Sequence, residues 1–272
     1  MPIIHAIVLG IVQGLTEFLP VSSSGHLELV PELLGWNQLS TDVSRAFDVA
    51  LHVGTLVAVI AYFRADLALY LRAGMRSIAT RSIPDVDARI AWLLVVATVP
   101  AVVIGAAFEG VIEDHLTGPV VVGTMLVVFG IVLWFADRLP ERRVMTSVRV
   151  REGWGLGLAQ SIALVPGTSR SGVSISAARA LGFDRDSATR ISFLMLLPVT
   201  VAAGVYTGLE LVREGFPSGM APPFLVGMAT SAITGYLAIW WLLRFLRTRG
   251  FGPFVIYRLV VGGAAILWFG LR

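Results

Sequence analysis

The chain has 272 residues, of which 56% are hydrophobic and only 14% carry a charge. Soluble domains contain about a quarter charged residues, so this composition argues against a soluble domain and predicts an integral membrane protein. Cysteine is absent, which excludes disulfides and thiolate chemistry, and the small net charge of +3, with arginine in place of all lysine, indicates membrane orientation rather than nucleic-acid binding.

Eight apolar segments follow one another along the chain, and six of them are long enough to cross a bilayer. A helical span needs about 17 to 25 mostly apolar residues. The six predicted spans are residues 47–63, 90–108, 119–136, 191–211, 223–243 and 253–271. The two remaining segments begin near residues 3 and 154, and each precedes three of the spans.

Both of these remaining segments are interrupted midway by proline, glycine and hydroxyl residues. Residues 3–20 run into "VSSSGHLELV", and residues 154–166 run into "GTSRSGVSISAARALG". Non-helical backbone at membrane depth is tolerated only where protein or a water-filled cavity surrounds it. We therefore expect two re-entrant helical hairpins. The predicted fold class is an all-α polytopic membrane protein with six transmembrane helices and these two hairpins.

Arginine residues gather in the loops 64–89, 137–152 and 244–249, whereas the loops between them are acidic or nearly neutral. By the positive-inside rule, the arginine-rich loops face the cytoplasm. This assignment requires that neither interrupted segment crosses the bilayer. Both termini then face outward, the first hairpin enters from the outside and the second enters from the inside.

The two halves of the chain also resemble each other. "QGLTEFLPVSSSG" at residues 13–25 aligns, with one gap, to "QSIALVPGTSRSG" at residues 160–172. We predict a single membrane domain, residues 1–272, built from inverted-topology repeats of about residues 1–136 and 153–272 that the cytoplasmic loop 137–152 joins. In such repeats the broken elements meet near the bilayer midplane and form the binding site.

The first hairpin contains an acid, a histidine and three hydroxyl groups. Glu17 lies within an apolar run, where a charge costs at least about 2.5–3.5 kcal/mol, so a functional role is the default interpretation. Gln13 lies one helical turn earlier and shares its face. The hydroxyl groups at the predicted turn are those of Ser22, Ser23 and Ser24, and His26 follows them. The alternatives are a structural ion pair for Glu17 and an ordinary polar role for His26.

The second hairpin contains an array of hydrogen-bond donors around one arginine. Main-chain N–H groups at the start of a helix bind anions, and the guanidinium fork of Arg170 suits phosphate. The other members of this predicted anion site are Gly167, Thr168, Ser169 and Ser171. The alternative is helix capping by the hydroxyl groups, with Arg170 extending to the membrane surface.

These groups together suit phosphoryl transfer, in which positioning and charge stabilisation supply most of the catalysis. A diphosphate would recruit a divalent cation, Mg²⁺ or Ca²⁺, with Glu17 as its carboxylate ligand. ATP hydrolysis is disfavoured because the chain lacks a glycine-rich nucleotide loop that ends in lysine. His52 and Asp48 are expected to support the cavity, and Arg258 is expected to extend from the last span to the cytoplasmic surface.

The segments "QGLTEFLPVSSSGHL" and "LVPGTSRSGVSISAARALG" resemble the two signatures of the undecaprenyl-pyrophosphate phosphatase (BacA/UppP) family of bacteria, and the resemblance extends over essentially the whole chain. It implies a plasma-membrane enzyme, dependent on a divalent cation, that hydrolyses undecaprenyl diphosphate to the monophosphate at a site open to the outer face. It also implies recycling of the lipid carrier for peptidoglycan synthesis and resistance to bacitracin. Gln13 stands where many members have glutamate, which concentrates the role of the acid on Glu17.

The resemblance implies catalytic roles for Glu17, Ser23, His26 and Arg170, and substrate binding by the other residues of the two motifs. Ser23 is the expected nucleophile, with His26 or Glu17 as its base, and attack by His26 or directly by water are the alternatives. A carrier that flips a polyprenyl phosphate through the same anion site is the alternative function, because broken helices in inverted repeats are typical of transporters. Small residues in the spans are compatible with a homodimer.

Overall fold

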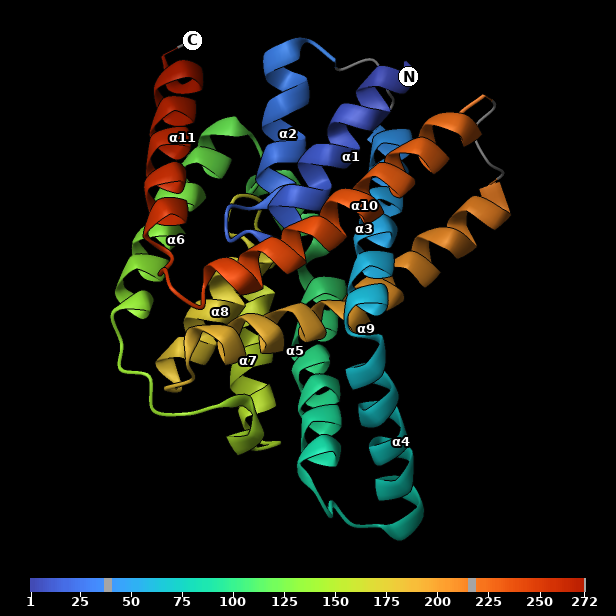
Figure 1. Cartoon of the computed structure of the whole chain (residues 1–272). Coiled ribbons are helices and arrows are strands. Elements are labelled where there is room, and N and C mark those ends of the chain that lie inside the picture. Colours follow the sequence, from blue (N-terminus) through green and yellow to red (C-terminus); the bar gives the residue numbers. More distant parts are fainter. Residues whose placement is uncertain (37–40, 215–218, 272) are drawn as a thin grey trace.

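Helices form almost the whole of the computed structural model, which describes residues 1–36, 41–214 and 219–271 (Figure 1). Within these residues there is no β-strand, and two short 3-10 helices, η1 (Met145–Ser147) and η2 (Ile162–Leu164), accompany the α-helices. The α-helices are α1 (Ile3–Phe18), α2 (Ser23–Leu34), α3 (Thr41–Tyr62), α4 (Arg64–Thr80), α5 (Val86–His115), α6 (Pro119–Asp137), α7 (Glu152–Ser161), α8 (Arg170–Ala180), α9 (Arg185–Glu214), α10 (Ala221–Phe245) and α11 (Gly252–Gly270).

Six of the described helices are long and apolar enough to cross a membrane, which confirms the predicted polytopic all-α fold. The apolar stretches are Val43–Tyr62, Val86–Phe108, Pro119–Asp137, Arg185–Val205, Ala221–Phe245 and Gly252–Gly270. Helices α5 and α9 are among those that start earlier than predicted, and polar residues begin both of them. The carboxylate of Asp85 caps α5 by accepting a hydrogen bond from Ala88 N at 2.9 Å, and Asp184 accepts one from Ser187 N at the start of α9 at 2.7 Å.

The two interrupted segments form helical hairpins. In Figure 1, α1 and α2 occupy the upper part of the molecule, α7 and α8 occupy the lower part, and the two turns meet between them. The side chain of Ser171 in the second hairpin donates a hydrogen bond to Leu19 O in the first, at 3.2 Å. Each hairpin thus returns toward the end of the molecule from which it came. That the hairpins are re-entrant stays a prediction, because it concerns their relation to the bilayer.

Close contacts at glycine residues join both hairpins to neighbouring helices. Helix α1 packs against α10, and α7 packs against α5. A Cβ atom on Gly14 would lie 2.6 Å from Ser231 O, and one on Gly157 would lie 2.4 Å from Ala97 O. Glycine at these positions therefore lets the backbones approach, as is usual between helices in membranes. These contacts hold α1 and α7 close to the neighbouring helices α10 and α5.

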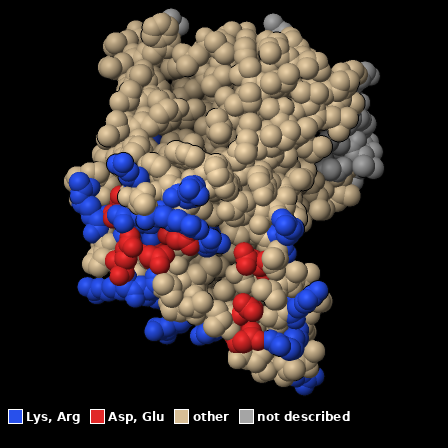
Figure 2. Space-filling view, in the orientation of Figure 1, with Lys and Arg blue, Asp and Glu red and all other residues tan. Residues whose placement is uncertain are grey.

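Charged side chains gather at one end of the molecule. Figure 2 shows most of the visible arginine, aspartate and glutamate residues toward the end opposite both termini, where α4 and the loop before α7 lie. The remaining surface in this view is almost free of charge. This distribution agrees with the predicted orientation, in which arginine-rich loops and termini face opposite sides of the membrane.

Candidate active site

Glu17 is the centre of the polar groups that lie between the two hairpins. It sits in the last turn of α1 and is only 5% exposed. Its Oε2 atom accepts hydrogen bonds from Ser23 Oγ at 2.5 Å and from Gln13 Nε2 at 3.0 Å. Its Oε1 atom lies 3.4 Å from Arg170 Nη2. One carboxylate therefore joins a serine of the first hairpin to the arginine of the second.

His52 on α3 is the fourth group around this carboxylate. Its Nε2 atom lies 3.5 Å from Glu17 Oε2. Its Nδ1 atom lies 2.7 Å from Asp48 O, an acceptor, so Nδ1 bears the hydrogen. Asp48 thus contributes its main-chain carbonyl, and the Nε2 atom of His52 faces Glu17.

The two hairpin turns have the same local geometry. Ser22 and Ser169 have φ values of 75° each, although only three described residues other than glycine have positive φ. Each is the N-cap of the following helix: Ser22 Oγ accepts from Gly25 N at 3.3 Å, and Ser169 Oγ accepts from Gly172 N at 3.1 Å. Strained backbone of this kind concentrates at functional sites. The turns thus direct the starts of α2 and α8, with Ser23 and Arg170, toward one another.

Gly167 has two reasons to be glycine. Its φ is +88°, and a Cβ atom there would lie 2.4 Å from Val122 O on α6. The turn before α8 is therefore pressed against α6. Thr168, next in the chain, is fully buried, and its Oγ1 atom has no hydrogen-bond partner among the described residues.

His26 lies in the first turn of α2 but is directed away from Ser23. Its Nδ1 atom donates to Ser22 O at 2.7 Å, and its Nε2 atom is 2.7 Å from the hydroxyl group of Tyr257 on α11. With Nδ1 protonated, a neutral ring accepts the Tyr257 hydrogen at Nε2. Both ring nitrogens are occupied. In this structure the side chain that contacts the Ser23 hydroxyl group is the Glu17 carboxylate, and the His26 ring contacts Tyr257 instead.

The position of the Arg258 side chain differs from the expected one. It was expected to extend to the cytoplasmic surface, but it is 0% exposed and points into the molecule. Its guanidinium donates to main-chain carbonyls of both hairpin turns and of α6. The sequence position of Arg258, near the beginning of the last span, gave no sign of which helix face it occupies.

A cavity of about 260 Å³ opens beside these groups. Its polar lining consists of His52, Gln160, Arg170 and Thr200, and Arg170 Nη1 is 3.4 Å from Thr200 Oγ1. The remainder is apolar and comes from α3, α5, α9 and the segment around η2. The cavity thus has a polar end that includes the positively charged Arg170 guanidinium, and an apolar remainder.

The oxygen atoms near Glu17 suit a hard cation that takes only one or two ligands from the protein. No three described His, Asp or Glu side chains converge as a metal-binding group. Glu17 nevertheless has a neighbouring oxygen, because the buried Oε1 atom of Gln13 has no hydrogen-bond partner within the described structure. Mg²⁺ often uses one or two carboxylates and completes its coordination with water and substrate phosphates. The residues fit such a cation, and they do not form an all-protein cage.

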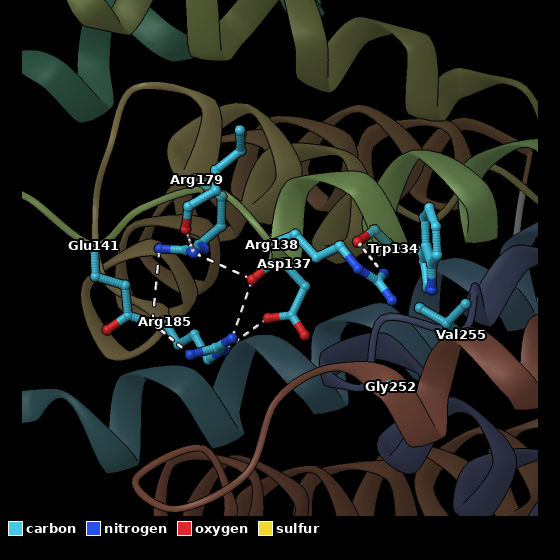
Figure 3. Close-up of a pocket in the computed structure, with 9 residues that line it drawn as sticks. Trp134, Asp137, Arg138, Glu141, Arg179, Arg185, Gly252 and Val255 are labelled. Atoms are coloured by element: carbon cyan, nitrogen blue, oxygen red, sulfur yellow. Dashed lines mark hydrogen bonds and ion pairs between the residues drawn. The ribbon is translucent and has the colours of Figure 1, made fainter.

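A larger cavity, of about 480 Å³, lies at the charged end of the molecule (Figure 3). Arg185 binds Asp137 at 2.6 Å and Glu141 at 2.5 Å, and the buried Arg179 donates to the carbonyls of Leu139 and Phe183. These contacts fasten the ends of α6, α8 and α9 together. No predicted site residue lines this cavity, and its carboxylates already have arginine partners, so we regard the smaller cavity as the candidate active site.

The structure brings together most of the side chains predicted from the sequence. Glu17, Gln13, Ser23 and Arg170 form one connected group, and the remaining residues of the motifs, Ser22, Ser24, Gly167, Thr168, Ser169 and Ser171, form its two turns. Sequence reasoning missed Thr200, Tyr257 and Gln160. The signal for Gln160 was present, because it aligns with Gln13 in the internal repeat; both of its buried amide atoms lack a described partner.

Comparison with known proteins adds an independent finding. A family model described as "Bacitracin resistance protein BacA" matches residues 6–264. The chain is 45% identical over 266 residues to a protein of Teredinibacter turnerae named undecaprenyl-diphosphatase, covering 96% of this chain and 97% of that one. Proteins of the same name from Geobacter sulfurreducens, 45% identical over 100% of both chains, and from a Nocardioides species, 41% identical over 97% of this chain and 95% of that one, are also similar.

Proposed function

Because the chain belongs to the bacitracin resistance protein BacA family, we propose that it is a membrane phosphatase that hydrolyses undecaprenyl diphosphate to undecaprenyl phosphate and inorganic phosphate. The resemblance of its two motifs to this family is thereby confirmed. The reaction regenerates the monophosphate carrier for peptidoglycan synthesis. It also confers bacitracin resistance, the property for which the family is named.

The contact between Ser23 and Glu17 is the observation that supports hydrolysis most directly. With 2.5 Å between Ser23 Oγ and Glu17 Oε2, the carboxylate is within reach to take the serine proton. In the proposed first step, Ser23 Oγ forms a bond to the terminal phosphorus, the bridging P–O bond breaks, and undecaprenyl phosphate leaves. In the second step, water hydrolyses the phosphoserine and releases inorganic phosphate. A carrier would need the anion site but not this pair of groups.

The terminal phosphate would be held at the start of α8. Arg170 lines the cavity, and Ser169 places the first N–H groups of α8 beside it. A helix N-terminus and an arginine fork both favour a phosphate, and both stabilise charge as the bond breaks. The ion pair between Arg170 and Glu17 would then exchange for one between Arg170 and phosphate, which leaves Glu17 available as a base.

A divalent cation, Mg²⁺ or Ca²⁺, is part of the same proposal. Glu17 would be its carboxylate ligand and Gln13 Oε1 a neighbouring oxygen, with phosphate oxygens completing the coordination. When bound, the cation would neutralise charge on the diphosphate. Glu17 also remains in contact with Ser23, so the same carboxylate would serve both as a ligand of the cation and as the base for Ser23.

The orientation proposed for the protein follows the arginine distribution. We place it in the bacterial plasma membrane with the arginine-rich end in the cytoplasm and the active site toward the outer face. The equal geometry of Ser22 and Ser169 supports the inverted repeat of about residues 1–136 and 153–272. Pairing of two copies through small residues of the spans belongs to the same proposal, and chemical cross-linking in membranes tests it.

Phosphate release from undecaprenyl diphosphate by the purified protein in detergent tests the function, with and without a chelator. Ser23→Ala should reduce kcat by about 100-fold or more. Ser187→Ala, which removes another buried hydroxyl group far from the cavity, should leave kcat within about 3-fold. Mass spectrometry of the quenched reaction should find phosphoserine at Ser23.

The outcomes separate the mechanisms. Substantial turnover by Ser23→Ala would refute the serine route and favour direct attack by water, while the phosphatase itself would stand. No phosphate release by a folded wild-type protein would refute the phosphatase. Flipping of polyprenyl phosphate in liposomes would then test the carrier.

A further inference from the structure

Arg258 on α11 is a buried charge that the proposed mechanism does not use. Each of its hydrogen-bond partners in the described part of the chain is a main-chain carbonyl oxygen. Nε donates to Leu126 O at 3.0 Å and Nη1 to Pro20 O at 3.2 Å. Nη2 lies 3.2 Å from Met125 O, 3.0 Å from Gly167 O and 2.9 Å from Thr168 O. A single guanidinium therefore contacts three separate segments.

Two of these segments are the turns of the hairpins. Carbonyl groups in a turn lack the helical partner that satisfies the rest of the chain, and an unsatisfied carbonyl within a membrane protein is costly. Arg258 supplies the missing donors to Pro20, Gly167 and Thr168. Its planar fork has five N–H groups in a fixed arrangement, so the carbonyls it binds are held at fixed relative positions.

The positions of these carbonyls connect Arg258 to the chemistry. Pro20 precedes Ser23 by three residues, and Thr168 precedes Arg170 by two. The guanidinium also lies against the beginning of α8, where a Cβ atom on Gly172 would be 3.1 Å from Nη1. A movement of Arg258 would thus change the distance between the Ser23 turn and the Arg170 turn.

We propose that Arg258 is a positioning residue for hydrolysis: it fastens the two hairpin turns to each other and so aligns Ser23 and Glu17 with the phosphate bound at Arg170. This inference rests on the proposed function. Arg258 does not touch the reacting atoms; it acts through the main chain of both turns. A purely structural role is the competing explanation, because any buried arginine that binds carbonyls contributes to stability.

Arg179 provides a matched control. It is 1% exposed and also donates to main-chain carbonyls, those of Asp137, Leu139 and Phe183, but at the charged end of the molecule. We would compare Arg258→Lys with Arg179→Lys, because lysine keeps the charge but lacks the fork. The rate and the KM for undecaprenyl diphosphate would be measured per folded molecule, with folding checked by gel filtration and thermal unfolding.

The expected result is a difference in kcat between the two variants. Misplacement of catalytic groups by about 1 Å costs about 100-fold, so Arg258→Lys should lower kcat by about 30-fold or more, with KM within about 5-fold. Arg179→Lys should keep kcat within about 3-fold although its thermal stability falls. Equal losses in both variants, or a wild-type kcat in Arg258→Lys, would overturn the proposal.

A milder variant covers the case in which Arg258→Lys does not fold. A Cβ atom on Gly130 of α6 would lie 3.2 Å from the Cβ atom of Arg258, so Gly130→Ala displaces this side chain without removing it. The same loss of kcat at nearly constant KM is expected, to a smaller extent. A folded Gly130→Ala protein with wild-type kcat would count against the positioning role.

A second readout is independent of activity. The chain has no cysteine, so a single introduced thiol reports local opening without background. Ser171→Cys places the thiol where the two hairpins touch, and Ser187→Cys places one at an equally buried position, 5% exposed, far from the turns. Each would be combined with Arg258→Lys, and alkylation by a small thiol reagent would be timed.

Faster alkylation at position 171 alone is expected, by about 10-fold, because the turns separate when the fork is lost. An unchanged rate at 171, or equal acceleration at both positions, would overturn the proposal. If the folded wild-type protein releases no phosphate, the proposed function fails, and the alkylation rates then decide separately whether Arg258 fastens the turns.

Discussion

Replacement of Glu17 by glutamine tests the centre of the proposed site. The substitution keeps the shape of the side chain and removes its charge and its ability to accept the Ser23 proton. Four contacts change: the hydrogen bond from Ser23 Oγ at 2.5 Å, that from Gln13 Nε2 at 3.0 Å, the ion pair with Arg170 at 3.4 Å, and the contact with His52 Nε2 at 3.5 Å. Loss of a general base lowers a rate by about 10²- to 10⁴-fold, equivalent to about 2.7–5.5 kcal/mol of activation free energy.

Substrate binding should respond in the opposite direction. Arg170 loses its carboxylate partner in the free enzyme and is then available to the diphosphate, whereas loss of the carboxylate ligand weakens binding of the cation; at a saturating concentration of the cation, KM should therefore not rise. Hydrogen bonds to charged groups are worth about 1.5–3 kcal/mol each, and Arg170 is partly exposed, so the loss of stability should be about 1–3 kcal/mol. Kinetics of phosphate release and thermal unfolding in detergent measure the two effects separately.

Glu28→Gln is the matched control for this experiment. Glu28 is also a carboxylate of the first hairpin, and its Oε1 atom accepts a hydrogen bond from Gly118 N at 2.7 Å, away from the cavity. The Glu28→Gln variant should be less stable than the wild type, but its kcat should stay within about 3-fold of the wild-type value. A Glu17→Gln enzyme that keeps more than about a tenth of the wild-type kcat would refute Glu17 as the general base.

Two further substitutions test the second hairpin. Arg170→Lys keeps the charge but loses the fork that suits phosphate, and we expect KM to rise by about 10- to 100-fold in the phosphate-release assay; an unchanged KM would show that Arg170 does not bind the substrate. Gly167 has a φ of +88°, and a Cβ atom there would lie 2.4 Å from Val122 O. Gly35 has a similar φ of +66° but open space around it. Gly167→Ala should therefore lower thermal stability well beyond Gly35→Ala. Equal losses in these two variants would mean that the close contact with α6 is unimportant.

The spans and the interrupted segments were predictable because they depend on local properties. Apolar length and the positions of proline, glycine and serine are written in the sequence, and the backbone in a membrane has few ways to respond to them. The same applies to the two motifs, whose residues are adjacent in the chain. The boundaries of α5 and α9 were less predictable, since their first turns are polar and are stabilised by capping side chains.

The contacts of His26 and His52 show where the prediction from sequence reached its limit. His26 follows three serines, and a role as base for Ser23 was one expectation. In the folded chain its partner is Tyr257, 231 residues away, while Ser23 contacts Glu17. His52 was expected only to support the cavity, and its ring lies beside the Glu17 carboxylate. Distances along the chain do not determine such pairs; the packing of α3 and α11 around the hairpins does.

The sequence by itself determined that this protein is a six-span membrane protein with two interrupted helices and two motifs for phosphate chemistry. Only the tertiary structure decided that Arg258 is buried between those motifs. Arg258 and Gly262 lie one helical turn apart on α11, and a Cβ atom on Gly262 would be 2.6 Å from Gly123 O on α6. This contact and that between Gly130 and Arg258 place the face of α11 that carries Arg258 against α6. On this face Arg258 points inward to the carbonyls of both turns, whereas its position near the cytoplasmic end of the last span predicted an arginine at the membrane surface.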